Sequence, residues 1–246
     1  MSTANGKSSH PPTARSSKPP RLPSSAPAAT RKRKRLRKEE IILEATRLFA
    51  ERGYEGASMG DLAERVGLRK ASLFHHFPSK DVLYATVLLQ LVESVRVAIV
   101  GAAASEGSFE ARLDALTDAL TTTLGSQPHA ARLFVREAME TGPAFSRAPG
   151  QTGPAMRERL GRTINDVLSA SLEFARAGQR EGAFNPDVDA TQIIVSLIGI
   201  HFMPFAIGEI VERFTGTSPF HASFLEQRKT AVRSQVRDLV LVKRKT

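Results

Sequence analysis

Residues 58–81 read SMGDLAERVGLRKASLFHHFPSKD, and this stretch decides the fold. Ser58 can cap a helix over residues 59–66, because an acidic residue follows three positions later, as in a capping box. Gly67 breaks this helix and supplies a tight turn. A second short helix is expected at about residues 69–76, so the two elements form a helix-turn-helix arrangement.

Two short helices cannot bury their own apolar faces, so the flanking segments must close a core around them. Upstream, apolar residues from Ile41 to Phe49 recur at helical spacing, and Gly53 ends that helix. Downstream, Ser79 can cap a long apolar helix that reaches about Val100.

The remainder of the chain predicts one helix after another. There is no run of alternating apolar and polar residues that would indicate a strand, and there is no internal repeat. We therefore expect an all-α protein, with a loop at residues 141–153 and a bend at Pro204. The expected helices cover residues 108–124, 128–140, 154–180, 187–214 and 219–242.

The formal net charge of the 246 residues is +10, but the excess is confined to the N-terminal segment. Eleven of the 35 Lys and Arg residues lie within residues 1–38, which contain no Asp or Glu. This asymmetry indicates a polyanionic partner, with nucleic acid first and an anionic membrane surface second. The chain has no Cys, which excludes disulfides and thiolate metal sites and suits a reducing cytoplasm.

The N-terminal segment has two parts. Residues 1–30 are rich in Ser, Pro, Ala and Thr and are expected to be disordered. The run RKRKRLRK at residues 31–38 is either a solvated charge run or an arm that docks on DNA phosphates. No apolar segment follows the early charges, so no secretory signal is expected, whereas the Arg-rich, acid-free composition leaves a transit peptide open.

Residues 38–89 resemble the N-terminal domain of the TetR/AcrR family of helix-turn-helix transcriptional regulators. The resemblance rests on LFAERGY at the end of the first helix, on the cap Ser58, on LAERVGL, and on the recognition segment that ends in HHFPSK. It implies an all-α homodimeric repressor that binds a palindromic double-stranded DNA operator and is released by a small-molecule effector.

The same resemblance implies a domain organisation. It combines an N-terminal three-helix helix-turn-helix domain with a C-terminal helical domain for ligand binding and dimerisation. The expected parts are a disordered basic tail over residues 1–35, a DNA-binding domain over 36–96 with its motif at about 58–77, and an effector-binding and dimerisation domain over 97–246.

The resemblance places Leu68, Leu73 and Phe77 in the core of the motif, and it also assigns DNA contacts to single residues. Independently of the family, Arg69 can form two hydrogen bonds with the edge of a guanine. Lys70 can contact a phosphate as well as a base, and Ser72 can reach a base or a phosphate. The alternatives are a solvated helix start for the two cations and a hydroxyl bonded to its own backbone for the serine. The expected DNA-binding residues are Ser58, Arg69, Lys70, Ser72, Phe74, His75, His76 and Lys80.

Three of these positions have particular roles by resemblance. Ser58 caps the second helix and faces a phosphate, and Lys80 grips a phosphate from the start of the fourth helix. Phe74 departs from the family pattern, which has Tyr there. The tyrosine hydroxyl normally bonds a phosphate, so only ring packing remains at this position.

The adjacent histidines, His75 and His76, raise the question of metal binding or catalysis. Neighbouring residues on a helix diverge by about 100°, whereas chelating pairs are spaced at i, i+4 with a Glu between them. Ser72 is the one nucleophile near them. We therefore expect no metal, no cofactor and no enzymatic activity, and the histidines remain either DNA contacts or packing residues.

A ligand pocket is expected between the helices of the C-terminal domain. Few charges occur there, so the effector is expected to be lipophilic. His201 stands out because its polar tip lies in an apolar run and could orient a ligand, although most of these candidates could simply be core. The candidate lining residues are Phe134, Met139, Phe145, Met156, Phe174, His201, Phe202, Met203 and Phe205.

Residues 190–208 are uncharged for nineteen residues, which is near the length of a membrane span. They also contain Thr, Gln, Ser, His and Pro, so we expect a buried helix at a subunit interface, no membrane partner and a cytoplasmic protein. In proteins of the resembling family the last two long helices form a four-helix dimer bundle, which here implies residues 187–214 and 219–242.

An alternative function is a small-molecule-binding or enzymatic helical protein whose helix-turn-helix is vestigial. No catalytic triad spacing, phosphate-binding Gly loop or plausible pair of carboxylates in the sequence supports it.

Overall fold

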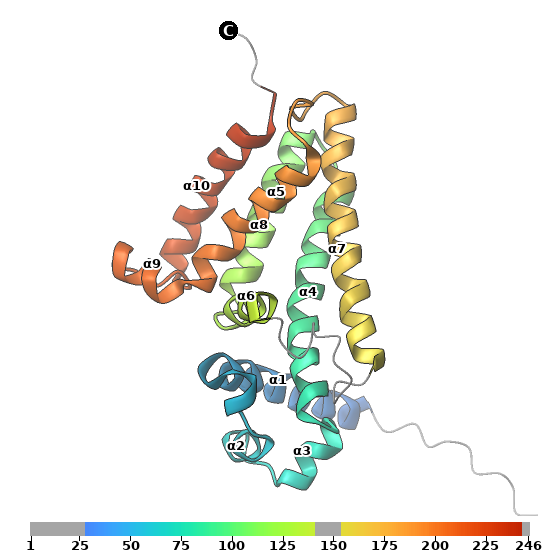
Figure 1. The fold of residues 1–246 in the computed structure, drawn as a ribbon, viewed down its shortest axis with the longest axis vertical. Coiled ribbons are helices and arrows are strands. Elements are labelled where there is room, and N and C mark those ends of the chain that lie inside the picture. Colours follow the sequence, from blue (N-terminus) through green and yellow to red (C-terminus); the bar gives the residue numbers. More distant parts are fainter. Residues whose placement is uncertain (1–27, 141–153, 243–246) are drawn as a thin grey trace, which may run out of the picture. The chain divides into compact units, whose positions relative to one another are not determined.

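The computed structural model describes residues 28–140 and 154–242. Within this part of the chain the regular structure is helical, apart from one antiparallel bridge between Phe184 and Leu241, so the all-α fold is confirmed. The helices are α1 (Ala28–Gly56), α2 (Met59–Arg65), α3 (Lys70–His76), α4 (Lys80–Ala104), α5 (Phe109–Gly125), α6 (Ala130–Glu140), α7 (Pro154–Arg180), α8 (Ala190–Ala206), α9 (Gly208–Thr215) and α10 (Ala222–Val240) (Figure 1).

The first helix begins earlier than the sequence predicts. α1 starts at Ala28, so residues 28–35, for which disorder is expected, are helical. Lys and Arg are good helix formers, which explains how a basic run can extend a helix. Residues 1–27, the rest of the expected tail, lie outside the described residues. Gly53 has φ 70° and ψ 177°, so the regular helical turns end there, as predicted.

The helix-turn-helix forms from the predicted local signals. The Ser58 side chain accepts a hydrogen bond from the backbone N–H of Asp61 at 3.0 Å, so its capping role is confirmed. Gly67 adopts φ 63°, a left-handed conformation that favours glycine, in the turn between α2 and α3. Leu73 in α3 and Phe77 directly after it are buried, as expected, and Leu68 is half-buried against the same core.

A first apolar core joins α1, α2 and α3 to the first half of α4. Its aromatic centre is formed by Phe49, Tyr54 and Tyr84, with the Tyr84 ring meeting each of the other two edge-on at 4.9 Å. The Tyr84 hydroxyl donates a hydrogen bond to the buried carboxylate of Glu137 at 2.7 Å. This bond ties α6 to the core that carries the helix-turn-helix.

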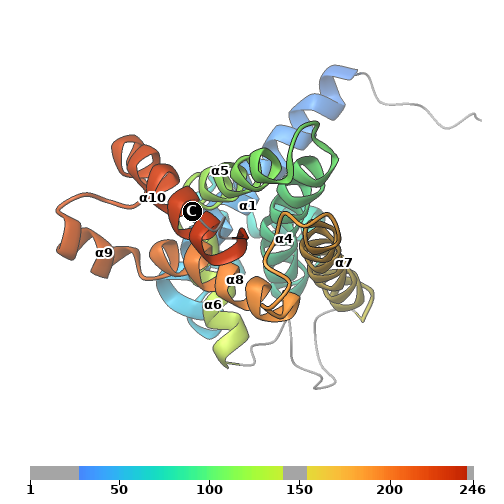
Figure 2. The same cartoon turned by 90° about the horizontal axis from the view of Figure 1, so that it is seen from above.

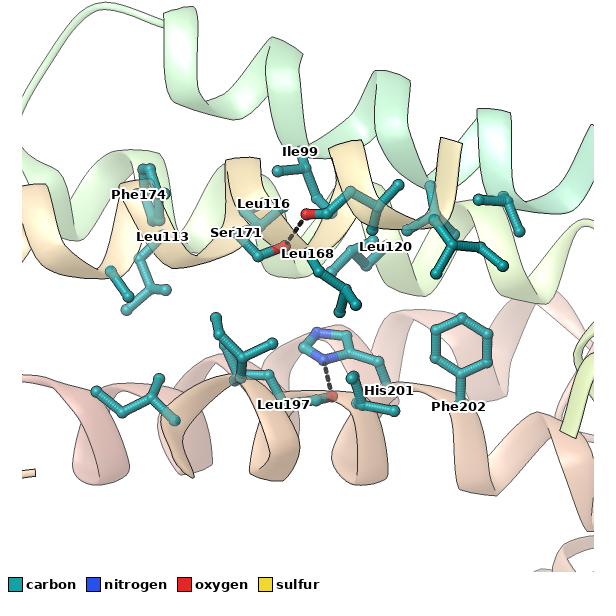
Figure 3. A pocket seen from close by; sticks show the side chains of 18 of the residues that line it. Ile99, Leu113, Leu116, Leu120, Leu168, Ser171, Phe174, Leu197, His201 and Phe202 are labelled. Carbon is teal, nitrogen blue, oxygen red and sulfur yellow. Dashed lines mark hydrogen bonds between the residues drawn. The ribbon is translucent and has the colours of Figure 1, made fainter. Parts of the chain in front are cut away.

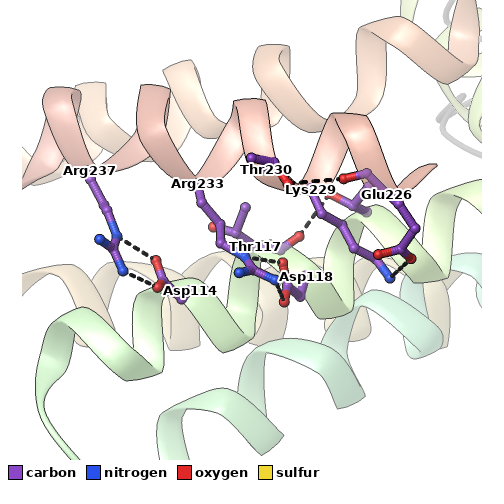
Figure 4. Close-up of polar contacts among 9 residues, drawn as sticks. Asp114, Thr117, Asp118, Glu226, Lys229, Thr230, Arg233 and Arg237 are labelled. Carbon is purple, nitrogen blue, oxygen red and sulfur yellow. Dashed lines mark hydrogen bonds and ion pairs between the residues drawn. The ribbon is translucent and has the colours of Figure 1, made fainter. Parts of the chain in front are cut away.

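A second apolar core is built by the remaining half of α4 with α5, α6, α7, α8 and α10. Seen from above, α4 lies between α5 and α7, and α10 lies along α5 on the side away from α7 (Figure 2). Figure 4 shows how α10 is attached: Arg233 and Arg237 each form a two-pronged ion pair, with Asp118 and Asp114 of α5. The bonds from the two Nε atoms measure 2.7 and 2.8 Å.

The expected helix over residues 187–214 is wrong, because the segment forms two helices. α8 and α9 meet at 76°, and the break lies at Ile207 rather than at Pro204. Pro204 has no N–H for the carbonyl of Ile200, but Nη2 of Arg228 in α10 donates to this oxygen at 2.8 Å. The freed carbonyl is therefore satisfied, and α8 continues past the proline.

The other helix boundaries agree closely with the sequence. α7 has the predicted bounds, and Ser79 accepts the predicted capping hydrogen bond at 3.2 Å. Ser108 caps α5 in the same way, also at 3.2 Å. α10 starts at Ala222 instead of about residue 219, because His221 is the residue that caps it. The expected loop over residues 141–153 lies outside the described residues.

α4 is long and apolar enough to span a membrane, and so is the bent pair of α8 and α9 if taken together. α4 contributes buried residues to both apolar cores, which is the position of a core helix in a folded domain.

Candidate DNA-binding surface and ligand cavity

Some side chains of α3 are buried in the core and others are exposed. The Leu73 side chain is fully buried, whereas Arg69, which caps the helix, Lys70 and Ser72 are exposed. The buried leucine anchors the short helix, so its polar residues are held at the surface without contributing to the core. The side chains predicted to read base edges are therefore exposed.

The aromatic and histidine positions of the motif differ in exposure. The Phe74 side chain is 38% exposed, His75 is exposed and His76 is half-buried. The centroids of the two imidazole rings are 6.1 Å apart and the ring planes meet at 70°. Among the described residues, no group of three or more His, Cys, Asp or Glu side chains could hold a metal ion.

The exposed Ser58 at the start of α2 can combine its capping role with a phosphate contact. Its oxygen accepts the N–H of Asp61, whereas its own hydroxyl proton is not used in that bond. The proton can thus be donated to an anion outside the helix. Its predicted phosphate contact stays a prediction.

Lys80 is engaged differently from its expected role. Its ammonium group donates to the carbonyl oxygens of Tyr54 at 2.9 Å and Ala57 at 3.2 Å, and it lies 4.2 Å from the centre of the Tyr54 ring. Lysine has three N–H donors, so one is left for a phosphate while two fasten α4 to the end of α1. The sequence gives no local signal for these contacts, because they join residues more than twenty positions apart.

Asp81 completes this junction. The carboxylate is buried and accepts a hydrogen bond from the Tyr54 hydroxyl. Burial first, and then the bond to Asp81, raise the pKa of Tyr54 above its ordinary value. The phenol therefore stays protonated and keeps donating, which holds α1 and α4 together beside α3.

The end of the basic run belongs to the folded domain. Arg37 donates through Nη2 to the carbonyl oxygen of Val66 at 2.5 Å, at the end of α2. The ammonium of Lys38 lies 5.4 Å from the centre of the Phe77 ring. These two cations bind the helix-turn-helix itself, so only the residues before them could form an arm for DNA.

A cavity of about 250 Å³ lies within the second core, between α4, α5, α7 and α8 (Figure 3). This volume is just below the ~300–1,000 Å³ of most small-molecule sites. Of the described residues that line it, only Ser171 on α7 and His201 on α8 have polar side chains. The location agrees with the predicted pocket between helices of the C-terminal domain.

Four of the candidate residues line the cavity. They are Phe134, Phe174, His201 and Phe202. Three others lie away from it: Met139 is 80% exposed, Met156 packs against the first core, and Phe205 is buried against the Phe220 ring. Met203 is 43% exposed and also lies outside the lining, and Phe145 is not among the described residues.

The sequence missed most of the apolar lining from α4 and α5. Leu113, Leu116 and Leu120 face the cavity from α5, and their helical spacing predicts a buried face. Nothing in that spacing distinguishes a filled core from a hollow one, because the packing of six helices decides it.

His201 is the polar centre of the cavity. Its side chain is 4% exposed, and Nδ1 lies 2.9 Å from the carbonyl oxygen of Leu197 in the preceding turn. A carbonyl can only accept, so Nδ1 carries the proton and Nε2 presents a lone pair. Nε2 has no hydrogen-bond partner in the described structure, and the ring points into the cavity (Figure 3). Burial lowers the pKa of His201 to about 4, so the ring is neutral.

Two family models match the chain. The model described as bacterial regulatory proteins, tetR family, matches residues 41–87, which include α2 and α3. The model described as the tetracyclin repressor-like C-terminal domain matches residues 110–236, which include most of the helices around the cavity.

Curated relatives match part of the chain. The HTH-type transcriptional repressor AcnR of Corynebacterium diphtheriae is 34% identical over 113 residues, which are 45% of this chain and 54% of the relative. The biofilm operon icaADBC HTH-type negative transcriptional regulator IcaR of Staphylococcus aureus is 47% identical over 47 residues, 19% of this chain and 25% of the relative. The chain thus spans between a quarter and about half of the length of these relatives.

Solved structures share the fold over most of the chain. The ketosteroid transcriptional regulator KstR2 of Mycobacterium tuberculosis superposes with a TM-score of 0.67 at 17% identity, covering 84% of this chain and 96% of the relative. AibR, solved in complex with isovaleryl coenzyme A and operator DNA, gives a TM-score of 0.61 at 18% identity, covering 81% and 97%. At these identities the likeness shows the fold alone.

Proposed function

Because this chain belongs to the tetR family of bacterial regulatory proteins, we propose that it is a transcriptional repressor that binds a palindromic DNA operator as a homodimer. In this proposal α3 reads the operator, and a small molecule in the cavity between α4, α5, α7 and α8 releases it. The two curated relatives are named a repressor and a negative regulator, which favours repression over activation. Such a protein acts in the cytoplasm, where the DNA is, and needs no catalytic step.

The exposed side of α3 is the observation that carries this proposal. A recognition helix lies in the major groove, where Arg69 can bind a guanine edge and Lys70 or Ser72 a base or phosphate. A good base-reading pair contributes roughly 1–3 kcal/mol of discrimination. Ser58 and the remaining donor of Lys80 can fix the backbone on either side.

Contacts of α6 support a link between ligand and DNA. Phe134 lines the cavity, and Glu137, one turn later, accepts the hydrogen bond of Tyr84 in α4. The Tyr84 ring packs edge-on against Tyr54, whose carbonyl oxygen holds Lys80. A ligand that shifts α6 would therefore act on packed and hydrogen-bonded groups that reach the helix-turn-helix.

The outer side of α8 supports the dimer. Val195 is 57% exposed and Met203 is 43% exposed, whereas Ile193 and His201 on the inner side are buried. The helix is thus apolar on both sides, and an exposed apolar side indicates a binding partner. A second copy of the chain, packed through α8 and α10, fits the symmetry of a palindromic operator.

Selection of duplexes from a random double-stranded DNA library tests the function. The chain should enrich one palindromic sequence, and Lys70→Ala should lower its affinity for that duplex. The control variant Lys229→Ala lies on α10 and should bind as the parent chain does. Enrichment of no sequence, together with turnover of a small molecule in the cavity, would favour the alternative of an enzyme with a vestigial helix-turn-helix.

A further inference from the structure

The polar groups of the cavity have a common property. The Ser171 hydroxyl donates its proton to the Val167 carbonyl oxygen of its own helix at 2.8 Å, so toward the cavity it offers oxygen lone pairs. His201 likewise gives its Nδ1 proton to Leu197 and offers Nε2. The cavity therefore presents hydrogen-bond acceptors, on α7 and on α8, in an otherwise apolar wall (Figure 3).

An unpaired acceptor at this depth is unfavourable without a ligand. Buried polar atoms nearly always have a partner, because an unsatisfied one loses its hydration without compensation. A ligand that brings an O–H or N–H to Nε2 satisfies it. A ligand with only an acceptor could bond to the histidine only if the proton moved from Nδ1 to Nε2. The lone pair left on Nδ1 would then face the lone pairs of the Leu197 carbonyl oxygen at 2.9 Å, which is repulsive.

The cavity also disfavours anions. None of the described residues that line it is Lys or Arg, and the neighbouring Arg228 is committed to the carbonyl oxygen of Ile200 on α8. A carboxylate or phosphate there would be buried without a counter-charge, which is strongly unfavourable. Phosphate-bearing ligands such as the isovaleryl coenzyme A bound to AibR need a cationic contact that these lining residues do not offer.

We propose that the effector is a neutral, largely apolar molecule with a hydroxyl or N–H group that donates a hydrogen bond to Nε2 of His201. This inference rests on the proposed function only in treating the cavity as the effector site. The apolar part of the molecule packs against the leucine and phenylalanine side chains of α5 and α6, and its single donor selects it over apolar molecules of the same size.

Two isomeric probes test the proposal on the full chain without DNA. 1-Octanol and heptyl methyl ether have the same atoms, but only the alcohol is a hydrogen-bond donor, and octanoate adds a negative charge. By calorimetry at neutral pH, octanol should bind about tenfold more tightly than the ether, which is the effect of one hydrogen bond. Octanoate should bind more weakly than octanol.

Variants assign that preference to the histidine. In His201→Leu the octanol and the ether should bind equally, and folding should be intact because an unpaired buried nitrogen is removed. Ser196→Ala, at an exposed position of the same helix outside the lining, should keep the tenfold preference. Tighter binding of the ether or of octanoate, a preference that survives in His201→Leu, or no binding of octanol up to about 1 mM would each overturn the proposal.

Failure of the DNA-binding function would be visible separately. Loss of sequence enrichment in the DNA selection speaks against the repressor, whereas the probe measurements speak only about the cavity.

Discussion

The two cores that share α4 differ in how completely they are filled. Around the first half of α4, the rings of Phe49, Tyr54 and Tyr84 pack on one another, and the Tyr54 hydroxyl finds its partner in Asp81. Around the second half, six helices leave a cavity of about 250 Å³ with an unpaired imidazole nitrogen. A filled core holds a recognition helix in one position, whereas a hollow core can accept a ligand and respond to it.

The difference between the cores predicts that a Leu→Ala substitution lowers the free energy of unfolding by unequal amounts in the two cores. Leu73→Ala removes a fully buried side chain from the filled core and should lower the free energy of unfolding by about 4 kcal/mol. Leu116→Ala should cost only about 2 kcal/mol, because this side chain already faces empty space and makes fewer contacts. Urea unfolding at one protein concentration measures both, and equal costs would contradict the distinction.

We expect the dimer contact on α8, one of the helices that enclose the hollow core. Val195→Glu places a charge on the outer side of α8 and should weaken dimerisation by about 2–3 kcal/mol, or roughly a hundredfold. Val97→Glu, at a valine that is 58% exposed on α4, is the matched control and should leave the dimer intact. Sedimentation equilibrium decides this. A dimer that resists the first change and dissociates on the second would move the interface to α4.

The buried histidine should give the hollow half a dependence on pH. The folded pKa of His201 is about 4 against an ordinary value of 6.5, so the unfolded chain binds the proton first as the pH falls. The contribution of His201 to the free energy of unfolding is therefore complete above the ordinary pKa and is lost as the pH falls toward 4. Between about pH 7.5 and about pH 5 the loss should be about 2 kcal/mol.

Comparison with His201→Leu isolates that contribution from those of other groups. The stability of the variant should fall by about 2 kcal/mol less than that of the parent chain over the same interval, measured by urea unfolding. Parallel curves for the two proteins would show that His201 is not a buried neutral group.

In the filled half, the smallest expected effect is a gain. Phe74→Tyr adds a hydroxyl to a ring of the recognition helix that is 38% exposed, at the position where the family pattern has a phosphate-bonding tyrosine. Affinity for the selected duplex should rise by about 1 kcal/mol, roughly fivefold. Fluorescence anisotropy measures it, and no gain would show that the side chain at position 74 does not contact a phosphate.

Short-range signals in the sequence predict the helices and turns around the filled core well. Ser58 and Ser79 cap the helices that follow them, and Gly67 takes the left-handed conformation in the turn, because each of these roles depends on residues within a few positions. The exposure of Lys70 beside the buried Leu73 follows from helical spacing in the same way.

Long-range contacts explain what the sequence missed. α8 passes Pro204 because Arg228, twenty-eight residues after Ile200, bonds the freed carbonyl oxygen. Lys80 is drawn to the end of α1 by carbonyl oxygens that are distant in sequence. His201 was singled out for its polar tip, but its unpaired Nε2 follows only from the packing of the cavity.

The salt dependence of binding to the selected duplex tests the central claim most directly. The chain should lose affinity linearly with the logarithm of salt concentration, and Lys70→Ala should bind more weakly with a slope smaller by about 0.9, the effect of one phosphate contact. Lys229→Ala, remote from α3 in sequence, should leave the slope unchanged. If Lys70→Ala changes neither the affinity nor the slope, α3 is not the surface that holds DNA.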